Sequence, residues 1–141
     1  MKYKGNSSKG IDFYYHLFNS KEFCIELGKF TLLSSKLEAE LILYYKRNNV
    51  KDTLEKATLG KLISIGSKNN LFDKNLSLIL NQFLIQRNEL THNIYSIFRN
   101  IKDNSILEKD NLLDSDVWTY TDFIYQVNEN FNHISEIIKE K

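Results

Sequence analysis

The chain has 141 residues, of which 42% are hydrophobic and 26% charged, and its formal net charge at pH 7 is +1. These values are ordinary for a globular protein with a buried core, so we expect one domain over residues 1–141, with residues 1–12 flexible. The near-zero charge excludes the strongly basic surface of an indiscriminate nucleic-acid binder, so any site for a polyanion must be local.

The number of cysteines and the hydropathy of the sequence indicate the cellular compartment, and the spacing of the histidines indicates whether a metal could bind. The single Cys24 cannot form an internal disulfide and fits a reducing compartment, and we expect it to be a small core residue. The sequence shows neither a secretory leader nor a membrane-spanning apolar run, which predicts a cytoplasmic protein without membrane association. The three histidines show no metal-ligand spacing, so we expect no metal and no cofactor.

The N-terminal third predicts an aromatic arm or short helix up to residue 18, and then a long helix over residues 20–47. Asn19 and Glu22 resemble a capping box at its start. Gly28 inside it suggests the close approach of another helix. A stripe at helical spacing marks its buried face: Phe23, Leu27, Phe30, Ser34, Leu37, Leu41 and Tyr44.

The middle of the chain predicts two further helices. The first is short and extends from Thr58, its N-cap, to Gly66, its stop. The Asn69-Asn70 pair predicts a turn. The second helix is expected from about residue 73 to about residue 101, with no Gly or Pro to break it. Whether it is one continuous helix or bends near Gln86 stays open.

The C-terminal part predicts a loop over residues 102–114 with one helical turn, and then a helix that starts at Asp114 or Ser115. Its apolar stripe alternates strictly by three and four residues: Val117, Tyr120, Ile124, Val127, Phe131, Ile134 and Ile138. No strand-like alternation of useful length occurs. The expected fold class is all-α, an up-and-down bundle of four main helices plus a short extra helix.

The helix expected over residues 73–101 carries an unusual polar surface. Its apolar face comprises Leu80, Phe83, Leu90, Ile94, Ile97 and Phe98. The opposite face, with Arg87 at its border, comprises Asn88, Thr91, His92, Tyr95, Ser96 and Arg99. All of these polar side chains can donate hydrogen bonds, whereas a solvated helix face usually carries Lys and Glu. The pattern therefore indicates a surface that faces an anion.

Within this surface, the run Arg87-Asn88-Glu89-Leu90-Thr91-His92 resembles the R-x4-6-H signature of HEPN domains (higher eukaryotes and prokaryotes nucleotide-binding). HEPN domains are small all-α bundles. Many are metal-independent ribonucleases of toxin–antitoxin, abortive-infection and other anti-phage systems. The helix order is similar over most of the chain, whereas the specific residues cover only about 83–98.

The resemblance implies that Arg87 and His92 are catalytic residues of an endoribonuclease, a toxin or defence effector. RNA supplies its own nucleophile, the 2′-hydroxyl, and a histidine can move its proton near neutral pH. An arginine can hold the phosphate oxygens on which charge builds, and the products would be a 2′,3′-cyclic phosphate and a 5′-hydroxyl. Substrate contacts are expected from four neighbours: Asn88, Thr91, Tyr95 and Arg99.

The expected partners are RNA, a second copy of the chain and an antitoxin protein. Arg87 and His92 lie about 140° apart round an ideal helix and do not face one phosphate squarely. A two-fold dimer through the motif-bearing helix would bring two copies of each to one cleft, and HEPN domains typically form such dimers. In HEPN toxins paired with a nucleotidyltransferase antitoxin, a modified Tyr follows the His by two residues. Here Tyr95 follows by three, so we do not expect that pairing.

Two other functions stay open at this point. The chain could be a HEPN-like domain that binds nucleotide, RNA or protein without cleaving it. It could also be a non-catalytic helical interaction module, with Arg87 and His92 on a solvated face. The presence of both residues favours the ribonuclease, whereas the near-zero net charge favours the other two.

Overall fold

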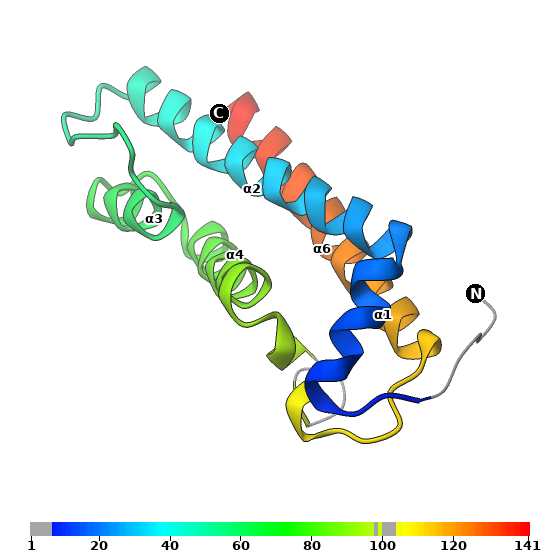
Figure 1. Cartoon of the computed structure of the whole chain (residues 1–141). Coiled ribbons are helices and arrows are strands. Elements are labelled where there is room, and N and C mark those ends of the chain that lie inside the picture. The colour runs from blue at the N-terminus through cyan, green and yellow to red at the C-terminus, as the bar shows by residue number, and fades with distance from the viewer. Residues whose placement is uncertain (1–6, 98, 100–103) are drawn as a thin grey trace. The chain divides into compact units, whose positions relative to one another are not determined.

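The computed structural model describes residues 7–97, 99 and 104–141. In these residues the regular structure is helical and no strand forms, so the predicted all-α class is confirmed. The α-helices are α1 (Tyr14–Asn19), α2 (Lys21–Arg47), α3 (Leu59–Lys68), α4 (Lys74–His92) and α6 (Asp114–Glu140), as Figure 1 shows. Short 3-10 helices cover Gly10–Phe13, Ile94–Ser96 and Ile106–Glu108. None of the described helices is long and apolar enough to cross a membrane.

The chain divides into two compact units. The first unit comprises Met1–Phe30 and Asn88–Asn128, and the second comprises Thr31–Arg87 and Glu129–Lys141. Helices α2, α4 and α6 each contribute residues to both units. That residues 1–141 form one domain stays a prediction.

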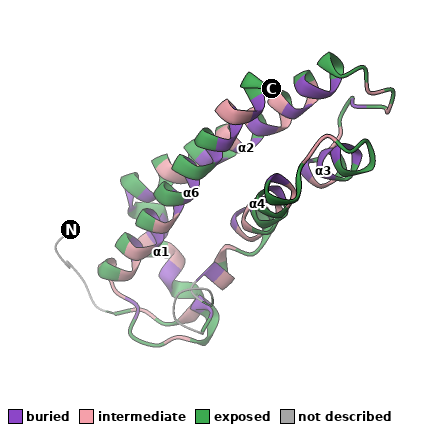
Figure 2. Ribbon diagram, turned by 180° about the vertical axis from the view of Figure 1, so that it is seen from behind, coloured by how far each residue is buried: buried purple, intermediate pink, exposed green. Residues whose placement is uncertain are grey.

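The buried stripes of α2 and α6 follow the predicted spacing. All seven predicted stripe residues of α6 are buried, and those of α2 are buried except for Leu27, which is half-buried. Figure 2 shows these buried positions recurring between exposed ones along both helices. Helical periodicity in the sequence therefore located the core of both long helices.

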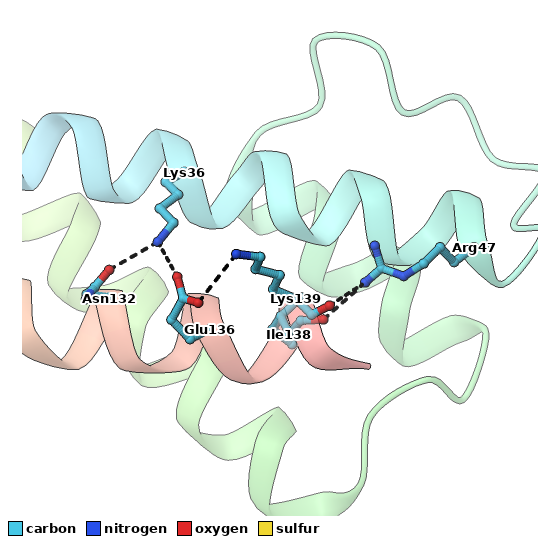
Figure 3. A network of polar contacts seen from close by, with 6 residues as sticks. All are labelled: Lys36, Arg47, Asn132, Glu136, Ile138 and Lys139. Atoms are coloured by element: carbon cyan, nitrogen blue, oxygen red, sulfur yellow. Dashed lines mark hydrogen bonds and ion pairs between the residues drawn. The ribbon is translucent and has the colours of Figure 1, made fainter.

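In the second unit, hydrogen bonds and an ion pair link α2 to α6 outside their buried stripes. Lys36 Nζ lies 2.6 Å from Glu136 Oε1. The Arg47 guanidinium donates to backbone carbonyls in the last turn of α6, at 3.2 and 3.4 Å (Figure 3). The negative end of the α6 dipole lies at these carbonyls, so a cation is favourable there, and the Ile138 carbonyl also accepts the backbone N–H of Lys141 at 3.2 Å.

In the first unit, the N-terminal arm packs on the start of α6. The backbone of Ser8 exchanges two hydrogen bonds of 2.9 Å with that of Leu112. His16 Nδ1 lies 2.9 Å from Asp114 Oδ1, and the imidazole stacks on the Phe13 ring. The expected arm or short helix is therefore present as Gly10–Phe13 and α1.

Three local expectations for α2 are wrong. The cap at its start is Ser20, whose Oγ accepts the backbone N–H of Phe23 at 3.2 Å, because Asn19 is still part of α1. Cys24 is exposed because it lies one residue off the buried stripe, about 100° round the helix. Gly28 is exposed too, and a Cβ built on it meets no described atom within 4 Å, so no helix approaches it closely.

Helix α3 begins as expected but does not stop at Gly66. Thr58 Oγ1 accepts the backbone N–H of Lys61 at 3.4 Å, which confirms the predicted N-cap. The helix continues to Lys68 and ends in the expected turn, where Asn70 adopts a φ of 54°. The left-handed conformation that often follows a helix end thus occurs at Asn70, and the predicted stop at Gly66 is wrong.

Gly66 is a glycine because its neighbours fill the space of a side chain. A Cβ at this position would collide with the Phe72 ring and the Tyr45 hydroxyl. Tyr45 is fully buried, and its hydroxyl donates to the Leu62 carbonyl at 2.5 Å. Burial raises the pKa of Tyr45 far above its ordinary value, so the phenol stays neutral.

We predict that Gly66→Ala destabilises the protein by about 1–3 kcal/mol, because the added methyl group overpacks the contact with Phe72 and Tyr45. The matched control is Gly28→Ala, which is also inside a helix but open to solvent. It should stabilise the protein by about 0.5–1 kcal/mol through helix propensity alone. Urea denaturation of both variants measures the difference, and a Gly66→Ala variant as stable as the control would contradict this packing.

Candidate functional site

Helix α4 carries the motif and ends at His92. Asp73 caps its first turn by accepting the backbone N–H of Leu76 at 2.7 Å. At the other end Asn93 leaves the helix with a φ of −131° and a ψ of 40°. The Asn93 carbonyl accepts both the backbone N–H and the hydroxyl of Ser96, at 2.8 and 2.7 Å. This local turn competes with continuation of the helix, and no Gly or Pro is needed.

The predicted polar face is therefore wrong beyond His92. Asn88, Thr91 and His92 lie in the last turns of α4, at helical spacing. Tyr95 lies in the 3-10 helix Ile94–Ser96, and Arg99 follows it, so neither continues the same helical face. Phe98 of the predicted apolar face and the predicted helix end at residue 101 lie outside the described residues.

Arg87 belongs to the second unit, where it faces a carboxylate. Its side chain is 24% exposed, and one guanidinium nitrogen lies 3.9 Å from Glu38 Oε1 of α2. The same Glu38 oxygen accepts the first backbone N–H of α3, that of Leu59, at 3.1 Å. Glu38 thus connects the motif arginine to the start of α3.

Glu38 is a site residue that sequence reasoning missed. It follows the buried Leu37 directly, which places it at the edge of the α2 stripe. Carboxylates at the edge of a buried stripe are common, so this position alone does not distinguish Glu38 from other acidic residues on α2. Its role becomes visible only when Arg87 and Leu59 approach it.

The other candidate residues belong to the first unit and differ in their surroundings. Asn88, Thr91 and His92 are exposed and stand together because positions three and four apart are neighbours on a helix. The Tyr95 hydroxyl donates to Asn93 Oδ1 at 3.2 Å. Arg99 forms an ion pair with Glu108, with N···O at 3.2 Å, and both side chains are largely exposed.

The exposed end of α4 can exchange protons and hydrogen bonds with a ligand. His92 offers a ring nitrogen as donor or acceptor, Asn88 an amide and Thr91 a hydroxyl. In the described part of the chain, no three His, Cys, Asp or Glu side chains gather as metal ligands would. The chemistry available from these residues is acid–base transfer next to hydrogen-bond donors.

No protein-family model, no curated protein and no solved structure matches this chain. The resemblance to HEPN domains therefore rests on the sequence alone, mainly on the run from Arg87 to His92. A function has to be inferred from the chemistry of these residues and of their neighbours.

We predict that His92→Ala changes the free energy of unfolding by no more than about 0.5 kcal/mol, because the side chain is exposed. By contrast, Val127→Asp and Leu37→Asp place an uncompensated charge at core positions that are 2% and 0% exposed. Each should cost about 3–5 kcal/mol. Thermal melting compares the three variants. An equal loss for His92→Ala would mean that the histidine is structural.

Proposed function

We propose that this chain is a metal-independent endoribonuclease of the HEPN type, a toxin or defence effector, with Arg87 and His92 as its catalytic residues. The observation that carries the proposal is the exposed His92 at the end of α4, five residues after Arg87 on the same helix, in an all-α chain. An arginine and a histidine at this spacing are the HEPN signature. They are also residue types that can carry out cleavage by the RNA 2′-hydroxyl, one by moving a proton near neutral pH and one by holding the phosphate oxygens.

The proposed reaction needs no covalent enzyme intermediate. The 2′-oxygen attacks the adjacent phosphorus while a neutral His92 takes its proton, and the bond from phosphorus to the 5′-oxygen breaks. The leaving 5′-oxygen receives a proton from a protonated His92 of a second copy. Arg87 stabilises the negative charge on the non-bridging oxygens, and the 2′,3′-cyclic phosphate and 5′-hydroxyl balance the step.

In this mechanism, Glu38 would orient the Arg87 guanidinium before the substrate binds. The 3.9 Å separation permits charge attraction but is too long for a hydrogen bond. The guanidinium has five N–H donors, so it can bind a phosphate while still facing the Glu38 carboxylate. Asn88 and Thr91 would contact the phosphate or orient the imidazole, and Tyr95 and Arg99 would contact flanking nucleotides.

A homodimer through α4 supplies what one chain lacks. In-line cleavage needs a base and an acid on opposite sides of the phosphorus, and each chain offers one histidine in this region. A two-fold axis near α4 would place both copies of His92 at one cleft and would concentrate positive charge there despite the net charge of +1. An antitoxin is a further proposed partner, for which Tyr95 is not the expected modification site.

The alternative is a HEPN-like module that binds RNA, nucleotide or protein without cleaving it. One observation favours it: both arginines of the region already face carboxylates, Arg87 that of Glu38 and Arg99 that of Glu108. A phosphate would have to compete with these carboxylates, which weakens the electrostatic contribution to catalysis.

We predict cleavage of single-stranded RNA in the presence of EDTA, lowered at least about 100-fold in His92→Ala and in Arg87→Ala. A single-stranded oligonucleotide carrying a fluorophore and a quencher measures the rate. Mass spectrometry of the products should show a 2′,3′-cyclic phosphate. A 2′-deoxy substitution at the cleaved nucleotide should abolish the reaction, because it removes the nucleophile.

The matched control for this assay is His133→Ala, which removes another exposed histidine, on α6, and should retain wild-type activity. Equal residual degradation by the wild type and by His92→Ala would identify a contaminant. Such a result would favour the non-catalytic module, and RNA binding would then be measured directly by fluorescence anisotropy.

We predict a homodimer at micromolar concentration by multi-angle light scattering. If the active cleft uses both copies of His92, mixing the wild type with an excess of inactive His92→Ala should lower the activity per wild-type chain, because each mixed dimer keeps only one of the two histidines. A strict monomer that cleaves RNA would refute the composite cleft. A dimer in which each wild-type chain keeps its full activity in the mixture would place the motifs in separate sites.

A further inference from the structure

A pocket of about 340 Å³ opens on the first unit between α2 and α6. Its lining comes from the first turns of α2 and from the N-terminal half of α6: Glu22, Ile25, Glu26, Trp118, Thr121, Asp122 and Tyr125. None of these residues belongs to the Arg87–His92 motif. Its volume lies at the lower end of the range for small-ligand sites, so it suits a single side chain or a compact molecule.

The walls of the pocket are largely apolar and aromatic, yet exposed. Ile25, Trp118 and Tyr125 are 45%, 46% and 44% exposed, respectively. Trp118 and Tyr125 are seven residues apart, so they lie on the same face of α6 about two turns from each other. The faces of aromatic rings carry negative potential and attract organic cations.

The lining of the pocket also includes three acidic residues, Glu22, Glu26 and Asp122. Burial opposes ionisation of Glu26, but hydrogen bonds from Lys29 and Asn128, with the Lys29 charge, hold the pKa of this carboxyl below its ordinary value. Glu26 is therefore ionised at neutral pH and already neutralised in part by Lys29.

Glu22 and Asp122, also in the lining, are exposed, and in the described part of the chain neither has a cation within ion-pair distance. Two exposed carboxylates thus line the pocket together with exposed aromatic rings, without a counter-charge among the described residues.

We propose that this pocket binds an organic cation, an alkylguanidinium or alkylammonium group on an apolar stem. The stem would pack against Ile25 and the Trp118 ring, and the charged head would lie near Glu22 and Asp122. An RNA phosphate is disfavoured here because it would meet the carboxylates, so the pocket is distinct from the proposed RNA site. A bare metal ion is disfavoured because, among the described residues, no three His, Cys, Asp or Glu side chains gather as metal ligands would.

The pocket carries its own reporter. Trp118 is the single tryptophan of the chain, so its fluorescence responds to whatever enters the pocket. The probes are agmatine, N-acetyl-arginine amide and a tetra-arginine peptide. N-acetyl-citrulline amide is the matched control because its ureido group has the shape of guanidinium without the charge. We expect a saturable change with at least one cationic probe and none with the citrulline compound.

The variant that tests the site combines Glu22→Gln with Asp122→Asn. Both residues are exposed, so the fold should persist, and thermal melting checks this. Affinity for the cationic probes should fall about tenfold. The matched control is Glu129→Gln, another exposed carboxylate of α6 outside the pocket lining, which should bind like the wild type.

The outcomes separate the two sources of such a cation. Binding of agmatine supports a free small molecule as the ligand, and binding of the peptide alone supports an arginine side chain of a partner protein. An equal response to the citrulline compound, or unchanged affinity in the double variant, overturns the proposal. Isothermal titration calorimetry covers binding that leaves Trp118 fluorescence unchanged, and no heat with any probe also overturns it.

Discussion

The structure depends on the burial of one apolar stripe on each of two long helices. Helices α2 and α6 are 27 residues each, and both run through the first and the second unit. In the first unit the Phe23 ring meets Tyr120 edge-on, with ring centroids 6.4 Å apart. In the second unit the ion pair between Lys36 and Glu136 lies beside the stripes. Apolar burial supplies most of the stabilisation, and the polar contacts fix the pairing of the two helices.

The same aromatic stripe of α6 positions the segment that carries the candidate site. In the second unit the Phe131 ring stacks on Phe83 of α4, with centroids 4.5 Å apart. In the first unit the Tyr120 hydroxyl donates to the Ile94 carbonyl at 3.4 Å, in the turn that follows α4. The end of α4 is thus anchored on its apolar side, which leaves His92 free to face solvent. An anchored backbone of this kind would suit the proton transfer that we propose for His92.

The described surface carries two candidate sites for which we propose ligands of opposite charge. The end of α4 offers donors to an anion, through Asn88, Thr91 and His92. The pocket between α2 and α6 offers carboxylates and aromatic rings to a cation. A net charge of +1 averages over both and conceals them, so composition excludes an indiscriminate polyanion binder without excluding a local site. If both proposals hold, occupancy of the acidic pocket would remove charge that repels RNA, and the two ligands would be coupled electrostatically.

The sequence by itself determined the helical class, both core stripes, the Thr58 cap and the residues of the motif, because these signals depend on spacing within one helix. Tertiary structure decided what occupies the space beside each residue. Inside α3, residue 66 is a glycine because Phe72 and Tyr45 fill the space that a side chain would need. Likewise, Arg87 of α4 faces Glu38 of α2 within the second unit, although Glu38 lies 49 positions earlier in the chain. Contacts between residues so far apart in sequence leave no periodic trace, so the motif was readable but its neighbours were not.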